Sequence, residues 1–208
     1  MLKELKQQFI KDTIVAEMKK QLLEKGIQKT TLRGIAKELG IAFGNIYYYF
    51  KTKADIGDVI WAEFTNEYLD KFKKTMKTSE FQSKTGIEKL RYYYQNLYDY
   101  FVENPLYADL IAFLMGEKPR SIRAPKEIRE LTDKAREAIE NSLTELYEEG
   151  ISDGSIKANI PNLTLEVWSF NVAYVALIAN IIRYHEINKN MYEYFVENYL
   201  KRLSISGG

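Results

Sequence analysis

The chain has 208 residues, of which 46% are hydrophobic and 28% are charged. This composition is typical of a folded globular protein and too apolar for a disordered one. The chain has no cysteine, which excludes disulfide frameworks, thiolate metal sites and cysteine nucleophiles. Eleven glycines and four prolines leave few helix breakers, so the composition favours an all-α protein.

Charge is distributed unevenly along the chain. The net charge is +1, but residues 1–55 hold eleven bases against six acids, whereas the other 153 residues hold nineteen bases against twenty-three acids. A basic N-terminal segment suggests a polyanionic partner for that segment. The N-terminus lacks the apolar core of a signal peptide. The longest apolar run, Val172–Ile182, is shorter than the about 20 residues of a membrane span. We therefore expect an intracellular protein that does not enter the membrane.

Hydrophobic periodicity and capping residues predict three helices near the N-terminus. The first covers residues 9–25, with apolar side chains at four-residue steps from Ile10 to Leu22. Thr31 is the expected N-cap of a short second helix that ends at Gly40. The third short helix covers residues 44–50.

The rest of the chain is predicted to add six helices, which makes about nine in all. Their expected ranges are 53–77, 86–103, 105–115, 126–149, 162–185 and 190–203. Residues 78–85 are expected to be a polar connection and residues 116–125 a loop. Thr52, Asn162 and Asn190 are the expected N-caps of the helices that follow them.

Two short helices that follow a longer one, with glycine at the turn, are typical of a helix-turn-helix. Ala36 is small enough for the short helices to cross closely, and Gly40 permits a sharp turn between them. Four apolar residues are expected to hold both short helices against the first: Ile35, Ile41, Ile46 and Phe50. The third helix would then present its first residues to a DNA major groove about 12 Å wide.

The residues from Thr30 to Lys53, TTLRGIAKELGIAFGNIYYYFKTK, closely resemble the DNA-binding signature of the tetracycline-repressor (TetR) family of bacterial transcription regulators. The Thr pair, Ile-Ala, Gly-Ile, Tyr-x-x-Phe and the following Lys all keep their spacing. The resemblance covers about the first 55 residues. It implies a three-helix DNA-binding domain over residues 1–53. It also implies a helical-bundle domain over residues 54–208 that binds a small effector, forms a homodimer and usually releases operator DNA.

The resemblance also assigns residues to the DNA interface. It implies phosphate contacts for four residues: Thr31, Tyr47, Tyr49 and Lys53. It places five more near base edges or the adjoining backbone: Arg33, Phe43, Gly44, Asn45 and Tyr48. Their chemistry fits, because hydroxyls and Lys bind phosphates, Asn can bond adenine bidentately and Phe can contact a thymine methyl.

Three positions depart from the family pattern. Ala42 stands where Ser is common, so the recognition helix loses a side-chain cap. Phe43 replaces a polar or basic residue, and Leu39 replaces a usual Ala. Phe43 and Asn45 therefore make the preferred DNA sequence unpredictable from relatives.

Residues 56–208 contain thirteen Tyr, seven Phe and two Trp, most of which are expected to be ordinary core. Nine residues lie on helices whose family equivalents surround the effector pocket: Trp61, Tyr68, Tyr93, Tyr94, Tyr98, Phe113, Trp168, Asn171 and Tyr174. Such pockets are mostly apolar with a few orienting polar groups. We expect a neutral or weakly polar, lipophilic or aromatic effector.

The last two long helices are the predicted dimer interface. They carry three apolar stripes: Val175, Ile178 and Ile182; Tyr174, Leu177 and Ile181; and Tyr192, Phe195, Tyr199 and Leu203. A stripe that does not pack inward would leave a large apolar patch unless a partner covers it. The single histidine, His185, is expected to be a helix-end cation or an interface residue.

The sequence therefore predicts an effector-responsive DNA-binding regulator of the bacterial cytoplasm, most often a repressor. One alternative is a helical small-molecule binding or adaptor protein whose basic segment is only a solvated surface. The other is a helical enzyme, but carboxylates such as Glu148 and Glu149 are adjacent and point to different helix faces, and no phosphate loop completes a site. We expect no catalytic residue, no cofactor and no metal.

Overall fold

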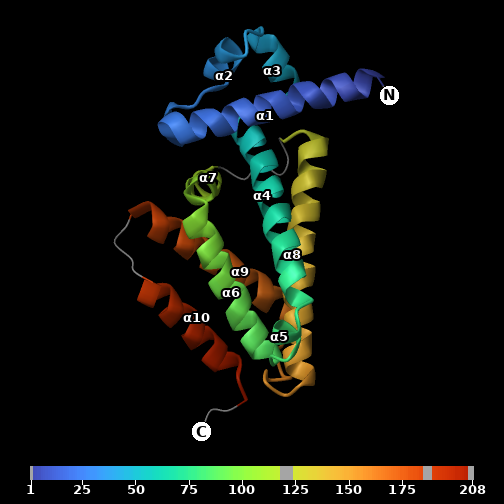
Figure 1. The fold of residues 1–208 in the computed structure, drawn as a ribbon, viewed down its shortest axis with the longest axis vertical. Helices are drawn as coiled ribbons and strands as arrows, with labels where there is room; N and C mark the ends of the chain where they lie inside the picture. The colour runs from blue at the N-terminus through green and yellow to red at the C-terminus, as the bar shows by residue number, and fades with distance from the viewer. Residues whose placement is uncertain (1, 118–123, 185–188, 206–208) are drawn as a thin grey trace. The chain divides into compact units, whose positions relative to one another are not determined.

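A computed structural model describes residues 2–117, 124–184 and 189–205, and these residues form ten α-helices (Figure 1). The helices are α1 (Leu2–Lys29), α2 (Leu32–Glu38), α3 (Phe43–Tyr49), α4 (Lys53–Met76), α5 (Ser79–Gln82), α6 (Gly86–Glu103), α7 (Pro105–Gly116), α8 (Lys126–Ser152), α9 (Leu163–Tyr184) and α10 (Lys189–Leu203). The only β-pairing among them is an isolated bridge between Ile156 and Ser204. The prediction of an all-α fold is confirmed.

Two helices, α1 and α5, differ from the prediction. The first begins at Leu2, because Leu, Lys, Glu and Gln favour a helix even where Leu5 and Phe9 stay exposed. The expected polar connection contains α5, whose N-cap Thr78 accepts a hydrogen bond from the Phe81 N–H at 3.3 Å. Phe81 is buried. The described residues thus contain ten helices instead of nine.

The predicted N-caps have different outcomes. Thr52 accepts a hydrogen bond from the Asp55 N–H at 3.1 Å, and the amide oxygen of Asn162 accepts one from the Leu165 N–H at 2.9 Å. Both are confirmed as caps. Asn190 lies inside α10, which begins at Lys189, so the prediction of a cap there is wrong. His185 lies outside the described residues.

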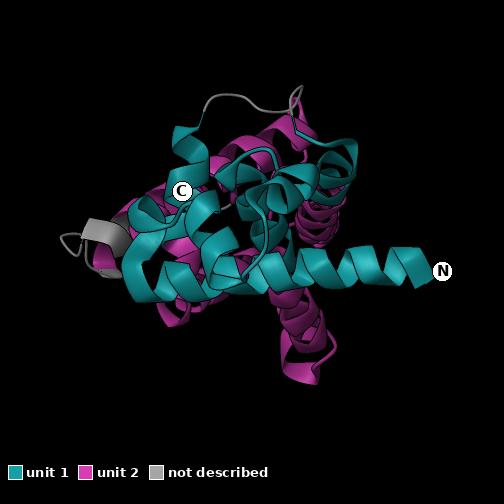
Figure 2. Cartoon of the chain, turned by 90° about the horizontal axis from the view of Figure 1, so that it is seen from above, with its two compact units in different colours: residues 1–64, 109–133 teal, residues 65–108, 134–208 magenta. Residues whose placement is uncertain are grey.

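The chain divides into two compact units (Figure 2). Unit 1 comprises residues 1–64 and 109–133, and unit 2 comprises residues 65–108 and 134–208. The helices α4, α7 and α8 contribute to both. Residues 54–64 and 109–133, which the predicted division placed in the second domain, therefore cluster with the N-terminal helices.

Unit 1 is held together by aliphatic side chains of its first three helices. Ile14 and Met18 of α1, Ile35 of α2 and Ile46 of α3 are fully buried. Gly26 interrupts α1 with a φ of 77°, a left-handed conformation that glycine adopts without strain. The apolar pattern of α1 thus provides the surface on which the two short helices pack.

Unit 2 has a core of aromatic residues. Tyr94 of α6 and Tyr174 of α9 meet edge to face with ring centroids 4.9 Å apart. The Phe170 ring of α9 stacks on Tyr199 of α10 at 3.4 Å. Offset and edge-to-face ring pairs stabilise beyond the area that they bury. The many tyrosines of the sequence are therefore mainly the packing surfaces of α6, α9 and α10.

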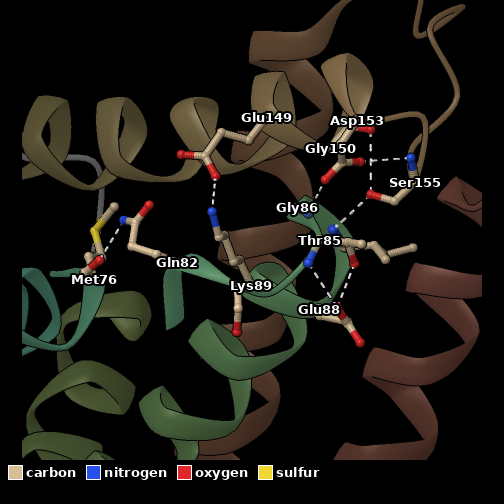
Figure 3. A network of polar contacts seen from close by, with 12 residues as sticks. Met76, Gln82, Thr85, Gly86, Glu88, Lys89, Glu149, Gly150, Asp153 and Ser155 are labelled. Atoms are coloured by element: carbon tan, nitrogen blue, oxygen red, sulfur yellow. Dashed lines mark hydrogen bonds and ion pairs between the residues drawn. The ribbon is translucent and has the colours of Figure 1, made fainter. Parts of the chain in front are cut away.

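The start of α6 crosses α8 at close range (Figure 3). A Cβ atom on Gly86 would lie 2.1 Å from the Gly150 backbone nitrogen, so only glycine fits there. The Gly86 N–H donates to Asp153 at 2.7 Å. The buried Lys89 ammonium donates to Glu149 at 2.5 Å. The crossing is fixed by both close backbone contact and partly buried polar contacts.

Among the described helices, α9 contains one segment, Leu163–Asn180, that is long and apolar enough to cross a membrane. The core helix of a soluble protein passes the same test. Tyr174 and Ile178 of this segment are fully buried in unit 2. About a third of the segment is buried, so one face of it belongs to the core.

Candidate nucleic-acid interface

Thr31 fixes the start of α2. Its hydroxyl accepts a hydrogen bond from the Gly34 N–H at 3.0 Å, so the predicted N-cap is confirmed. A Cβ atom on Gly34 would lie 3.1 Å from that hydroxyl and 3.4 Å from the Gln21 amide oxygen. The glycine therefore lets the cap lie close to α1.

The turn between α2 and α3 forms as its sequence predicts. Gly40 has a φ of 62°, and the Ile41 N–H donates to the Ala36 carbonyl at 3.0 Å. Ala36, Ile46 and Phe50 are buried, as is Ile35, whereas Ile41 is half-buried. The helices α2 and α3 lie next to each other (Figure 1). Apart from Ile46, the residues of α3 are exposed or half-buried.

The recognition helix α3 exposes most of its length. As expected, Ala42 precedes it without a side-chain cap. Five predicted DNA-contacting residues are exposed on α3: Phe43, Gly44, Asn45, Tyr47 and Tyr48. Tyr48 is 66% exposed and makes an edge-to-face contact with Tyr49 at 4.9 Å. Large exposed aromatic side chains on a short, well-anchored helix are available for a binding partner.

Two contacting rings of α3 lie between two cations, one on α2 and one just after α3. The Arg33 guanidinium lies over the Phe43 ring at 5.7 Å, and the Phe43 and Tyr47 ring centroids are 6.1 Å apart. The Lys51 ammonium lies 4.6 Å from the Tyr47 ring centroid and donates to the Tyr47 carbonyl at 2.6 Å. We call these four residues the cation–aromatic row. The sequence analysis assigns no role to Lys51, and its place in this row is seen only in the structure.

Lys53 is bound within unit 1. Its ammonium donates to the Ile27 carbonyl at 2.6 Å and lies 4.9 Å from the Phe113 ring centroid. Desolvation by burial lowers the pKa of Lys53, and the charge of Glu117 partly opposes that shift. Since an ammonium has three donors, the bond to Ile27 leaves two N–H groups for another acceptor.

Tyr49 is less accessible than its neighbours on α3. It is half-buried, and the Lys11 ammonium lies 5.9 Å from its ring centroid. Lys11 also pairs with Glu127 at 2.6 Å. Tyr49 is thus less available to a partner than the exposed Tyr47 and Tyr48.

Residues 14–58 match the model of the bacterial regulatory proteins of the tetR family. The matched segment contains α2, the Gly40 turn and α3. The match confirms the resemblance of this DNA-binding segment to the tetR family.

Two curated tetR-like relatives illustrate how far the similarity extends. An HTH-type transcriptional regulator of Staphylococcus aureus is 30% identical, over 38% of this chain and 58% of that protein. The fatty acid metabolism regulator protein of Bacillus subtilis is 27% identical, over 67% of this chain and 66% of that protein. The chain thus spans less than two thirds of the length of either relative.

Solved tetR-family structures share the fold over nearly the whole chain. The transcriptional regulator FadR of Bacillus subtilis, in complex with stearoyl-CoA, has a TM-score of 0.65 at 19% identity. The match covers 94% of this chain and 98% of that one. FadR of Thermus thermophilus, a transcriptional repressor in complex with lauroyl-CoA, has a TM-score of 0.68 at 15% identity, over 95% and 97% of the two chains. The chain therefore shares its overall fold with these two regulators.

The predicted effector residues fall into several environments. Tyr68, Tyr93, Tyr94 and Tyr174 are brought together in the buried core of unit 2, with Tyr68 and Tyr93 centroids 5.7 Å apart. Asn171 of α9 is also buried in unit 2, and its side-chain oxygen has no hydrogen-bond donor among the described residues. Trp61 and Phe113 belong to unit 1 instead.

The other two predicted effector residues lie outside this tyrosine group. Tyr98 is half-buried and stacks on Tyr192 at 3.8 Å. Trp168 is 36% exposed, and the Arg136 guanidinium lies over its ring at 6.0 Å. Sequence reasoning missed several aromatic neighbours of the group, for which helical spacing was the only signal: Phe72, Tyr100, Phe170 and Tyr199.

The core tyrosines carry no charge at neutral pH. Burial raises the pKa of Tyr68 and Tyr94 well above the ordinary value of 10. Burial also raises the pKa of Tyr147 to about 12, although hydrogen bonds to neighbouring tyrosines lower it. The interior of unit 2 therefore offers ring faces and neutral hydroxyl groups.

The structure identifies which apolar residues of the last helices face outward. Tyr174, Ile178, Tyr192, Tyr199 and Leu203 are buried in unit 2, so each of the three predicted stripes contributes to the core. The side chains of Ile181 and Ile182 lie outside the described set. A different apolar stripe of α9 is exposed. Leu165 is 60% exposed, and Trp168 and Val172, which follow it at helical spacing, are also exposed.

Proposed function

We propose that this tetR-family chain is an effector-responsive transcriptional regulator that binds palindromic operator DNA and represses transcription until a ligand releases it. The observation that carries this proposal is the exposed face of α3. The exposed aromatic and amide side chains of α3 lie within residues 14–58, which match the family model. The basic balance of residues 1–55 suits a phosphate backbone.

Operator binding is assigned to nine residues. Thr31, Tyr47, Tyr49 and Lys53 contact phosphates, and Arg33, Phe43, Gly44, Asn45 and Tyr48 lie at base edges or the adjoining backbone. The described contacts support these roles, because α3 is anchored by Ile46 and Phe50 and therefore presents a fixed surface. Phosphate contacts position the protein, and base contacts specify the sequence.

The effector is proposed to be a lipophilic small molecule that enters unit 2 and meets its tyrosine group. Neutral tyrosines and the unpartnered oxygen of Asn171 suit a mostly apolar ligand with one hydrogen-bond donor. Two structures of similar fold hold stearoyl-CoA and lauroyl-CoA. A long-chain acyl-CoA is therefore the first effector to test.

A homodimer through the last two long helices completes the proposal. Exposed Leu165, Trp168 and Val172 form an apolar stripe on α9 that a second copy would cover. The protein then acts in the bacterial cytoplasm, where its operator lies, and by binding rather than catalysis. The naming of its relatives as regulators supports this assignment.

Fluorescence anisotropy with duplexes from the protein's own promoter region tests the proposal. Binding should weaken with salt, with a log–log slope of about −0.9 per neutralised phosphate. A small-molecule binding or adaptor protein without DNA affinity would bind none of these duplexes at any salt concentration. Acyl-CoA should lower the affinity for the bound duplex.

A further inference from the structure

We infer that Arg33 and Phe43 act as one unit that reads a thymine next to a guanine in each operator half-site. This inference rests on the proposed DNA-binding function. It concerns the sequence that the protein prefers, which the family resemblance leaves open because Phe43 departs from the family pattern.

The first step is the contact between the two side chains. The Arg33 guanidinium lies 5.7 Å from the centroid of the Phe43 ring, although Arg33 is on α2 and Phe43 is the first residue of α3. Both side chains are exposed, and Arg33 makes no ion pair or hydrogen bond among the described residues. A cation over a ring face is attracted to the ring. The ring therefore limits where the guanidinium donors can point.

The second step is the anchoring of the ring. Tyr47 lies one helical turn further along α3 and contacts Phe43 at 6.1 Å. Lys51 also contacts Tyr47, with its ammonium 4.6 Å from that ring centroid and bonded to the Tyr47 carbonyl. The cation–aromatic row thus supports Phe43 and Arg33 before any DNA is present. Less side-chain freedom has to be lost on binding.

The third step is the chemistry of the two groups. An apolar ring can contact the C5-methyl group of thymine, and a guanidinium can donate bidentately to O6 and N7 of guanine. The two groups are closer together than the about 6.8 Å that two base steps span. They therefore reach neighbouring base pairs, which makes the recognised element a thymine–guanine step.

The test begins with selection of a bound duplex from a random library with the full-length protein. Single thymines of that site are then replaced by deoxyuridine, which lacks the methyl group, and single guanines by 7-deazaguanine, which lacks N7. We expect one thymine and one adjacent guanine in each half-site to be sensitive. Each replacement should weaken binding of the unmodified protein about 5-fold or more.

Variants assign each sensitivity to a residue. In Phe43→Ala the deoxyuridine effect should disappear, and in Arg33→Ala the 7-deazaguanine effect should disappear. In Phe43→Leu, which keeps an apolar side chain but no ring, the 7-deazaguanine effect should shrink, since the guanidinium has lost its support. Lys37→Ala is the matched control, because Lys37 is an exposed base of α2 outside the row; both sensitivities should persist there.

Several outcomes would overturn the inference. The inference that Arg33 and Phe43 recognise adjacent bases is contradicted if the sensitive bases are not adjacent. It is also contradicted if the sensitivities persist in the Arg33 and Phe43 variants. An Arg33→Ala variant that loses affinity equally for every sequence, with a salt slope smaller by about 1, would make Arg33 a phosphate contact. Absence of any bound duplex would instead contradict the proposed function itself.

Discussion

At the scale of single residues, α3 should separate sequence reading from backbone binding. Asn45 is exposed with an amide that can bond adenine bidentately, whereas Tyr47 offers one hydroxyl. We expect Asn45→Ala to cost about 1–3 kcal/mol on the preferred operator and to relax the preference at one or two base pairs. Tyr47→Phe should weaken binding equally on all sequences. Affinities across a randomised operator library measure both effects, and a uniform loss in Asn45→Ala would contradict its assignment.

Lys53 is expected to serve DNA binding and folding together. Its bond to the Ile27 carbonyl stabilises unit 1, and its two other donors suit a phosphate. Lys53→Ala should reduce the magnitude of the salt slope by about 0.9. It should also lower the free energy of unfolding by about 1 kcal/mol. Lys73→Ala, at an exposed lysine in unit 2, is the control for both measurements. A lower stability with an unchanged slope would restrict Lys53 to the internal bond.

Some of these residue roles follow from the sequence and some require the structure. The Thr31 cap and the burial of Ile46 and Phe50 follow from local spacing, which a helix converts directly into geometry. The contact of Arg33 with Phe43 joins two helices across a turn. The bond of Lys53 to Ile27 joins residues 26 positions apart. Periodicity carries no signal for such contacts, because they depend on how the helices pack.

At the scale of helices, the crossing of α6 and α8 depends on two glycines. Gly86→Ala would place a Cβ atom 2.2 Å from the Gly150 Cα atom, so the helices would have to separate. We expect a loss of about 3 kcal/mol in the free energy of unfolding, measured by urea titration. Gly116→Ala is the control, because no described atom lies within 4 Å of a Cβ there. An unchanged urea midpoint in Gly86→Ala would show that the helices do not meet so closely.

The start of α6 should also make stability depend on acid pH. Hydrogen bonds from the Thr85 N–H and hydroxyl lower the pKa of Glu88 below 4.5. Burial raises the pKa of Asp153, but hydrogen bonds from Ser155 and the Gly86 N–H outweigh this and lower it below 3.8. Both carboxylates therefore stabilise the fold fully at pH values above their ordinary pKa values. This contribution is lost as the pH falls through their lowered pKa values in the folded protein.

Urea unfolding between pH 7 and pH 3 measures this dependence. The doubly substituted Glu88→Gln, Asp153→Asn protein should be less stable at pH 7, and its stability should fall less steeply below about pH 4.5. Parallel curves for the two proteins would show that these caps do not contribute to acid sensitivity.

Helix order was predictable because periodic segments are long, but helix α5 was not. Ser79–Gln82 is too short for an apolar period, and only the buried Phe81 and the Thr78 cap explain it after the fact. The start of α10 shows the opposite failure. Asn190 has the side chain of an N-cap, yet the helix begins one residue earlier. Cap residues indicate a boundary only where packing allows the helix to start there.

At the scale of the whole molecule, the sequence predicted an aromatic second half but not which residues would be core. Tyr192 and Tyr199 belonged to a predicted dimer stripe and are buried in unit 2. Trp168 was a predicted effector residue and is partly exposed beside Arg136. A helical stripe is equally compatible with a core, a cavity and a partner. The choice depends on the neighbouring helices, which the sequence alone does not place.

The helix α4 offers a route between DNA and effector. It runs without interruption from Lys53 through Trp61 to Tyr68, a length of about 22 Å. Lys53 also lies against Phe113 of α7, so a predicted DNA residue and a predicted effector residue are in contact within unit 1. A ligand at the tyrosine group would contact Tyr68, and a displacement there would act on the same helix whose first residue, Lys53, lies against Phe113.

This route predicts reciprocal coupling. The two recognition helices of a dimer must fit half-sites about 34 Å apart or a multiple of that, so a small shift of α4 would cost operator affinity. By linkage, operator DNA must weaken effector binding by the factor by which effector weakens DNA binding, typically 5–150-fold. Calorimetric titration of acyl-CoA, or of another effector once identified, with and without operator measures this factor. Phe113→Ala should reduce it, since the contact with Lys53 is lost. Equal effector affinities in the two titrations of the unmodified protein would show that the ligand is not an inducer and that α4 does not couple the sites.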